Sequence, residues 1–145
     1  MTKFQRAIVN CPACNTQQEV EVYQTINVTL NPDLKQSLFE GNINILNCSE
    51  CDNRTPIDTT FLYHDMIQQL AIYYYPPTLI REDEFLKQFN VDGTLNHDTS
   101  MFPNEKLDDM AYLMQRPQIV FSMTDLLTYV VFRDRLMSVH YNSDK

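Results

Sequence analysis

The sequence is poor in glycine and has no long apolar run. Only Gly41 and Gly93 are present, so a glycine-rich loop of the kind that cradles phosphates is excluded. No apolar stretch approaches the roughly 20 residues that a transmembrane helix requires. Residues 1–10 have neither the apolar core nor the cleavage site of a secretory signal. We therefore expect a cytoplasmic protein with no membrane association.

Positive charge is also scarce. The chain has 11 Lys and Arg residues against 19 Asp and Glu residues, which gives a formal net charge of -8. An acidic molecule repels phosphate backbones on average. This charge disfavours nucleic-acid binding, although a local basic face remains possible as an alternative.

Apolar side chains are plentiful enough for a core. The chain has 145 residues, of which 43% are hydrophobic. A domain of this length buries about 70% of the surface that its unfolded chain exposes. We expect one globular domain whose stability does not depend on a metal alone.

Cysteines are few, but their spacing is regular. The four cysteines form two Cys-x-x-Cys pairs, and the residues that follow the pairs, Asn15 and Asp52, tolerate a left-handed backbone. Two such turns that face each other provide the four-coordinate sulfur shell that structural zinc prefers. We predict one structural Zn²⁺ ion. Its ligands are Cys11, Cys14, Cys48 and Cys51.

Two disulfides or a redox-active dithiol are the alternatives to zinc. Disulfides need an oxidising compartment, which the absence of a secretory signal does not favour. A thioredoxin-like Cys-x-x-Cys lies at a helix start within a βαβ unit, whereas strand-like residues flank both pairs here. Zinc is the better explanation of the cysteines.

Strand patterns alternate with one short helix in the first half of the chain. Asn31 suits an N-cap, Pro32 suits the first helical position, and Gly41 suits the end of that helix. Alternating or β-branched residues predict strands on both sides of it. These strands are expected at 3–9, 18–30, 42–47 and 56–62.

The segment 61–75 fits two interpretations. Leucine and methionine at every fourth position suit a helix, whereas Ile72–Tyr75 suits a strand. We favour a hairpin that turns at 66–69. Pro76 ends the segment in either case.

Further elements are expected after Pro77. A short helix should bury Phe85, Leu86 and Phe89, and a closing helix should begin at a capping box formed by residues 122–125. Periodicity divides the closing helix into a core-facing side with Leu126, Leu127, Val130, Val131 and Leu136, and a solvent-facing side with Asp125, Arg133, Asp134 and Arg135. The expected elements are a helix at 81–89, a loop at 91–104, a helix at 106–114, a strand at 118–121 and a helix at 122–139.

Together these patterns predict an α+β fold in a single domain, 1–145. A zinc-ribbon-like antiparallel β module with an inserted short helix, residues 4–77, is expected to pack against an α-rich C-terminal extension, residues 78–145.

Several short segments of the sequence resemble the CpXC family of bacterial and archaeal proteins, which is named for two paired-cysteine motifs. The resemblance covers residues 4–77, with a fainter likeness at 118–127, and it implies a zinc-ribbon-like module but no reaction, substrate or partner. Ser49 stands where the family name implies proline, and residues 81–104 match no family pattern. The matching words are Ile26-Asn27-Val28-Thr29-Leu30, Asn31-Pro32-Asp33-Leu34-Lys35 and Leu62-Tyr63-His64-Asp65-Met66, together with the two cysteine motifs.

Catalytic patterns are weak by comparison. Four thiolates fill the zinc shell, whereas catalytic zinc keeps a position open for water. His64 and Asp65 are the one titratable pair suited to acid–base chemistry, but adjacent residues on a strand point to opposite faces. Tyr73–Tyr75 could form an exposed patch for a partner or fill the core. We expect a zinc-stabilised protein–protein interaction module. The alternatives are a nucleic-acid-binding zinc ribbon and an enzyme that uses His64 and Asp65.

Overall fold

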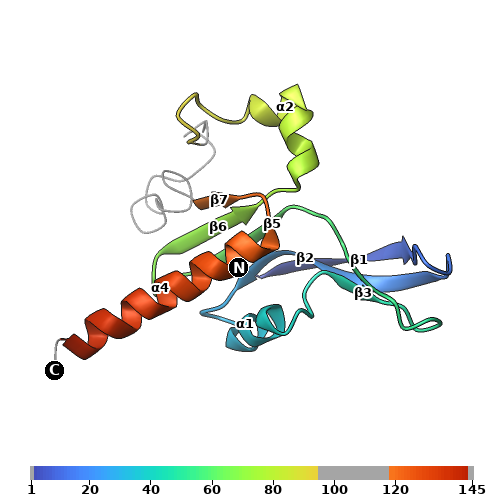
Figure 1. The fold of residues 1–145 in the computed structure, drawn as a ribbon, viewed down its shortest axis with the longest axis horizontal. Coiled ribbons are helices and arrows are strands. Elements are labelled where there is room, and N and C mark those ends of the chain that lie inside the picture. Colours follow the sequence, from blue (N-terminus) through green and yellow to red (C-terminus); the bar gives the residue numbers. More distant parts are fainter. Residues whose placement is uncertain (1, 95–117, 144–145) are drawn as a thin grey trace.

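The computed structural model describes residues 2–94 and 118–143, and these residues form an α+β fold as predicted. Strands predominate in the first half of the chain, and the long helix α4 ends the described part (Figure 1). The elements in order are β1 (Lys3–Asn10), β2 (Gln17–Asn27), α1 (Pro32–Phe39), β3 (Ile45–Asn47), β4 (Arg54–Pro56), β5 (Phe61–Asp65), β6 (Leu70–Tyr74), η1 (Pro77–Arg81), α2 (Asp83–Leu86), β7 (Gln118–Val120) and α4 (Met123–Ser143).

The main sheet has five strands in the order β1-β2-β5-β6-β7, and β3 and β4 form a separate ribbon. β1 and β2 are antiparallel, as are β5 and β6, but β2 pairs with β5 and β6 pairs with β7 in parallel. The sheet is therefore mixed, whereas the sequence patterns predicted an antiparallel β module. A parallel pair needs a long crossover connection, and α1 with the β3–β4 ribbon supplies it between β2 and β5.

Local sequence signals place α1 correctly. Pro32 occupies its first turn, and the chain leaves the helix through Gly41, which has a φ of 74°. Asn31 is at the N-cap position, but its side chain makes no capping hydrogen bond. Instead, Oδ1 of Asn31 accepts a hydrogen bond of 2.7 Å from the hydroxyl of Thr2.

The segment 61–75 is a hairpin, which confirms the favoured interpretation. Oδ1 of Asp65 accepts hydrogen bonds from the backbone N–H groups of Ile67, at 3.0 Å, and Gln68, at 3.1 Å. Gln69 completes the turn with a φ of 50°. Asp65 thus shapes the turn by a local side-chain-to-backbone bond of the kind that favours turns.

The helix expected at 81–89 is shorter and begins later, at Asp83. A 3₁₀ turn, η1, precedes the four-residue helix α2. Phe85 is buried as predicted, but Leu86 is 46% exposed. The strand expected at 118–121 is β7, whereas the helix expected at 106–114 lies outside the described residues.

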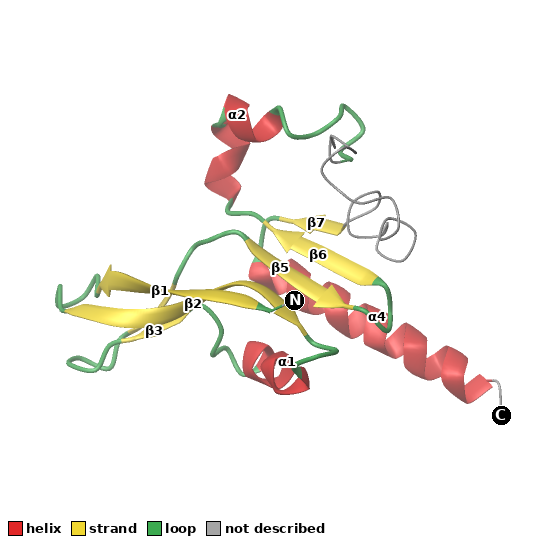
Figure 2. Cartoon of the chain, turned by 180° about the vertical axis from the view of Figure 1, so that it is seen from behind, coloured by secondary structure: helices red, strands yellow, loops and turns green. Residues whose placement is uncertain are grey.

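α4 packs on the sheet through fewer residues than its periodicity suggested. Leu126 and Val130 are fully buried, but Val131 and Leu136, which were also expected in the core, are 48% and 38% exposed. Arg133 and Asp134, which were expected in solvent, are half-buried. Both figures show the last turns of α4 extending beyond the sheet (Figures 1 and 2). The buried stripe is therefore confined to the first half of the helix.

The partial burial of Arg133 and Asp134 is explained by their bonding partners. Nζ of Lys35 on α1 lies 2.8 Å from Oδ2 of Asp134, and Nε2 of Gln68 donates to Oδ1 of Asp134 at 2.9 Å. Arg133 donates to the backbone oxygen of Gln68 at 3.0 Å. These bonds attach α4 to α1 and to the β5–β6 turn.

Buried side chains form two separate clusters. The main core lies between the sheet and the helices α1 and α4; its buried members are Ile26, Val28, Leu38, Ile43, Phe61, Tyr63, Leu70, Ile72, Tyr74, Val120, Leu126 and Val130. We call the second region, which consists of β1, residues 11–22, β3, β4 and the turns between them, the cysteine arm. Its buried cluster is Cys11, Leu46 and Cys48. The arm extends away from the end of the molecule that carries the last turns of α4 (Figure 1).

Within the described residues, no helix combines the length and the apolar character needed to cross a bilayer.

Candidate metal centre

The two Cys-x-x-Cys motifs form two turns with the same hydrogen bonding. The first joins β1 to β2, and the second joins β3 to β4. The backbone N–H of Asn15 donates to the carbonyl oxygen of Cys11 at 2.8 Å, and that of Asp52 donates to Cys48 at 3.0 Å. Asn15 and Asp52 have φ values of 62° and 60°, so both adopt the left-handed conformation that the sequence predicted. The equivalent turns bring two sulfur pairs to one place.

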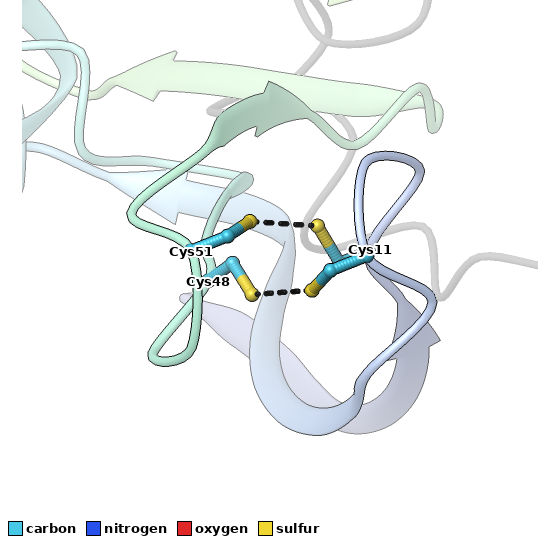
Figure 3. Close-up of side chains that lie close together, drawn as sticks. Cys11, Cys48 and Cys51 are labelled. Atoms are coloured by element: carbon cyan, nitrogen blue, oxygen red, sulfur yellow. Dashed lines mark hydrogen bonds between the residues drawn. The ribbon is translucent and has the colours of Figure 1, made fainter.

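The four sulfur atoms lie within 4.8 Å of one another. Cys11 Sγ is 3.6 Å from Cys51 Sγ, and Cys14 Sγ is 3.5 Å from Cys48 Sγ, so each close contact joins one turn to the other (Figure 3). A tetrahedral ion with metal–sulfur bonds of about 2.3 Å requires sulfur separations of about 3.8 Å. The cluster could therefore hold a metal ion.

Disulfides do not describe this geometry. A disulfide requires sulfur atoms about 2.05 Å apart, and all four cysteines are free thiols in the structure. The first cysteine of each turn is buried, with Cys11 2% and Cys48 3% exposed, whereas Cys14 and Cys51 are exposed. One side of the cluster therefore belongs to the small core of the arm, and the other side is exposed to solvent.

Hydrogen bonds of the turns favour thiolates at two positions. A backbone hydrogen bond within the turn, from Cys14, lowers the pKa of Cys11. Hydrogen bonds with the side chain and backbone of Thr16 lower the pKa of Cys14 to about 6. Thiolates rather than thiols are the metal ligands. The first turn is thus prepared to bind a cation at neutral pH.

Cys51 behaves in the opposite way. A backbone hydrogen bond from Asn53 acts to lower its pKa, but desolvation and hydrogen bonds with the other three thiols raise it to about 12. Both of these effects favour the neutral thiol, since desolvation disfavours a charged group and the hydrogen bonds are made with the protonated form. Cys51 therefore differs from Cys11 and Cys14 in the direction of its pKa shift.

One side chain outside the motifs connects the two turns. Nε2 of Gln18 donates to the carbonyl oxygen of Asn47 at 2.7 Å, and Oε1 of Gln18 accepts from the backbone N–H of Ser49 at 3.2 Å. Gln18 therefore fixes the second turn relative to β2. No sequence pattern indicates this role, because Gln18 is one of many polar residues on an alternating strand.

Comparison with protein families gives one result. The model of the CpXC family, described as CpXC protein, matches residues 9–140. This chain belongs to the CpXC family. Comparisons with curated proteins and with solved structures give no match.

The extent of the family match changes the boundary suggested by the sequence. The words that resemble CpXC proteins lie mainly within residues 4–77, but the match continues into α4. β2 begins in the cysteine arm and ends in the main sheet, where it pairs with both β1 and β5. The CpXC unit therefore includes the main core as well as the cysteine turns.

His64 and Asp65 are not arranged as an acid–base pair in this CpXC protein. They are neighbours on β5, and Asp65 uses its carboxylate to shape the β5–β6 turn. His64 is only 2% exposed, and burial lowers its pKa below the usual value of 6.5. Asp65 is 7% exposed, so both side chains of the pair are buried.

The tyrosine run is part of the interior rather than a surface patch. Tyr74 and Tyr75 are 9% and 8% exposed. The ring of Tyr75 lies 4.8 Å from that of Phe85 and 5.9 Å from that of Phe89, both in edge-to-face arrangements. These contacts attach the α2 segment to the sheet. The burial of Tyr74 and Tyr75 favours the core-filling alternative for the run, and Tyr73 is partly exposed.

Proposed function

We propose that this CpXC protein holds one Zn²⁺ ion through Cys11, Cys14, Cys48 and Cys51. The clustering of four sulfur atoms within 4.8 Å supports this proposal. Four protein thiolates complete a tetrahedral shell, so no position remains for a water or substrate. The metal is proposed to be structural: it joins the β1–β2 turn to the β3–β4 turn.

Elemental analysis of the purified protein tests the proposal. We expect one zinc per chain, and expect Cys14→Ser combined with Cys51→Ser to lose it. Ser49→Ala changes the turn that contains Cys51 without removing a sulfur, and this variant should keep the metal. A four-thiolate shell also accepts iron, so a visible absorption band with stoichiometric iron would contradict zinc. A protein with four free thiols and no metal would contradict the site itself.

For the role of the protein, we propose interaction with another protein through the outer face of α4. Phe132, Leu136 and Val139 share one face of this helix, pointing away from the buried Leu126 and Val130, and are 51%, 38% and 54% exposed. Aromatic side chains are enriched where protein interfaces form. The buried positions of His64 and Asp65 give no competing support for an enzyme.

Affinity purification from the native host tests the interaction. The wild-type chain should retain a partner, and Phe132→Glu should lose it. Ser138→Glu is the matched control, because it adds the same charge at an exposed position of α4 and should retain the partner. If the wild-type chain returns no protein above background, the proposal is wrong.

A mobility-shift assay addresses the nucleic-acid alternative. The net charge of -8 should prevent binding to DNA or RNA. Binding that weakens steeply as salt increases would instead favour a local basic face.

A further inference from the structure

A cavity of about 400 Å³ lies at the junction of the cysteine arm and the main core. Ile45, Pro56 and Ile57 line it from the arm, and Phe61, Tyr74 and Leu127 line it from the main core. Pockets that bind small molecules have volumes of roughly 300–1,000 Å³ and mostly apolar walls with a few polar groups. In size and lining, this cavity has the properties of a ligand site.

The cavity has one charged side chain, and it is negative. Asp58 lies in its lining, which contains no lysine or arginine. Asp58 is also absent from the ion pairs formed among the described residues. Asp58 is exposed, so its carboxylate lies where the apolar lining meets solvent. A carboxylate that is in no ion pair and lies beside an apolar wall favours a ligand that brings its own positive charge.

A buried tyrosine orients this carboxylate. The hydroxyl of Tyr74 donates to Oδ1 of Asp58 at 2.6 Å. Burial and the bond to Asp58 raise the pKa of Tyr74 to about 12, so the phenol keeps its proton at neutral pH. The bond uses one carboxylate oxygen, and the other can accept a hydrogen bond from a ligand.

We propose that this cavity binds a small organic amine, with its apolar part between the arm and the main core and its ammonium group on Asp58. A hydrogen bond between an ammonium group and a carboxylate is stronger than one between neutral groups. The net charge of -8 attracts cations to the molecule in general, and Asp58 adds a local negative charge beside the apolar wall of the cavity. The proposal is independent of the function proposed for α4.

Three matched probes test the charge requirement on the metal-bound, full-length protein. 3-Phenylpropylamine, 3-phenylpropan-1-ol and 3-phenylpropanoate share one apolar body and differ in the terminal group. Titrations followed by methyl NMR should show shifts at Ile45, Ile57 and Leu127. The amine should bind about tenfold more tightly than the alcohol, because a hydrogen bond to a charged group contributes more than a neutral one. The carboxylate should bind most weakly.

Two variants separate the site from general attraction to an acidic protein. Asp58→Asn should weaken amine binding about tenfold and leave alcohol binding unchanged. Glu84→Gln is the matched control: it removes one negative charge from α2, where the residue does not line the cavity, and should change neither affinity. Thr59→Trp should block both ligands by filling the cavity. If that variant does not fold, Asp58→Asn still decides the question.

Three results would overturn the proposal. The first is equal affinity for the amine and the alcohol. The second is an equal loss of amine binding in Asp58→Asn and Glu84→Gln, which would indicate diffuse electrostatic attraction. The third is a set of shifts that spares the three cavity methyl groups.

Discussion

The cysteine arm and the main core share the strand β2 but are stabilised in different ways. The main core contains twelve buried residues, among them large side chains such as Tyr63 and Phe61. The buried cluster of the arm contains three, and two of these are cysteines. Too little apolar surface is buried in the arm to offset the entropy of ordering its strands. The comparison indicates that a cross-link replaces a hydrophobic core at this end of the molecule.

The connection between the two regions is also limited. Apart from the continuous strand β2, Asn44 attaches the arm to β2 at the edge of the main core. Its Oδ1 accepts from the backbone N–H of Tyr23 at 2.7 Å, and its Nδ2 donates to the carbonyl oxygen of Tyr23 at 3.0 Å. We therefore expect the arm to unfold without unfolding the main core.

The largest expected effect comes from removing the proposed metal or one of the four cysteines. Structural zinc contributes about 10–16 kcal/mol of apparent binding free energy in small modules, which the arm cannot replace. Cys48→Ser should abolish amide-exchange protection in β1, β3 and β4, while β5, β6 and α4 remain protected. Hydrogen exchange followed by mass spectrometry measures both regions at once.

Ser49→Ala is the control for this experiment, because it alters the same turn without removing a ligand. If the arm of the Cys48→Ser variant kept normal protection, the cross-link would not be what holds it. Uniform loss of protection would show that the two regions unfold as one unit.

A substitution in the main core should have the reverse effect. Leu126 is fully buried against the sheet, and truncation of such a leucine to alanine costs roughly 2–5 kcal/mol. Leu126→Ala should lower the denaturation midpoint of the main core but leave the metal content at the wild-type value. Denaturant titration with elemental analysis checks both expectations. The exposed neighbour Thr128 provides a control: Thr128→Ala should change little.

Local sequence signals predicted most of the individual strands, helices and turns. Asn15 and Asp52 predicted the left-handed backbone of the cysteine turns, and Pro32 and Gly41 predicted the limits of α1. In each case the residue acts on its own backbone, so the information is contained in a few adjacent positions.

Long-range pairing could not be predicted in the same way. The parallel pairing of β2 with β5 depends on the path of the chain between them, and no residue type encodes it. Asp134 was assigned to solvent because it is charged, but Lys35 and Gln68, which are distant in sequence, give it partners at the surface of the main core. Gln18 was missed for the same reason: its two bonds reach the second cysteine turn.

A moderate effect is expected from removing the Gln18 side chain, which connects the two cysteine turns. Gln18→Ala removes both hydrogen bonds and should destabilise the arm by about 1 kcal/mol. The result should be faster transfer of the metal to a competing chelator, with the stability of the main core unchanged. Gln17→Ala, at an exposed neighbouring position, is the control. Equal transfer rates for both variants would mean that the bridge does not hold the second turn.

The smallest expected effect is a difference in the free energy of unfolding between variants of two main-core tyrosines, Tyr63 and Tyr74. The hydroxyl of Tyr63 is buried and has no hydrogen-bond partner among the described residues, whereas that of Tyr74 donates to Asp58. Removing an unsatisfied buried hydroxyl costs little and can stabilise a protein, but removing one member of a hydrogen bond costs about 1 kcal/mol. Tyr63→Phe should therefore leave the free energy of unfolding equal to or above the wild-type value, and Tyr74→Phe should lower it. Denaturant titration of the two variants measures the difference, and a larger loss for Tyr63→Phe would show that its hydroxyl is satisfied within the folded protein.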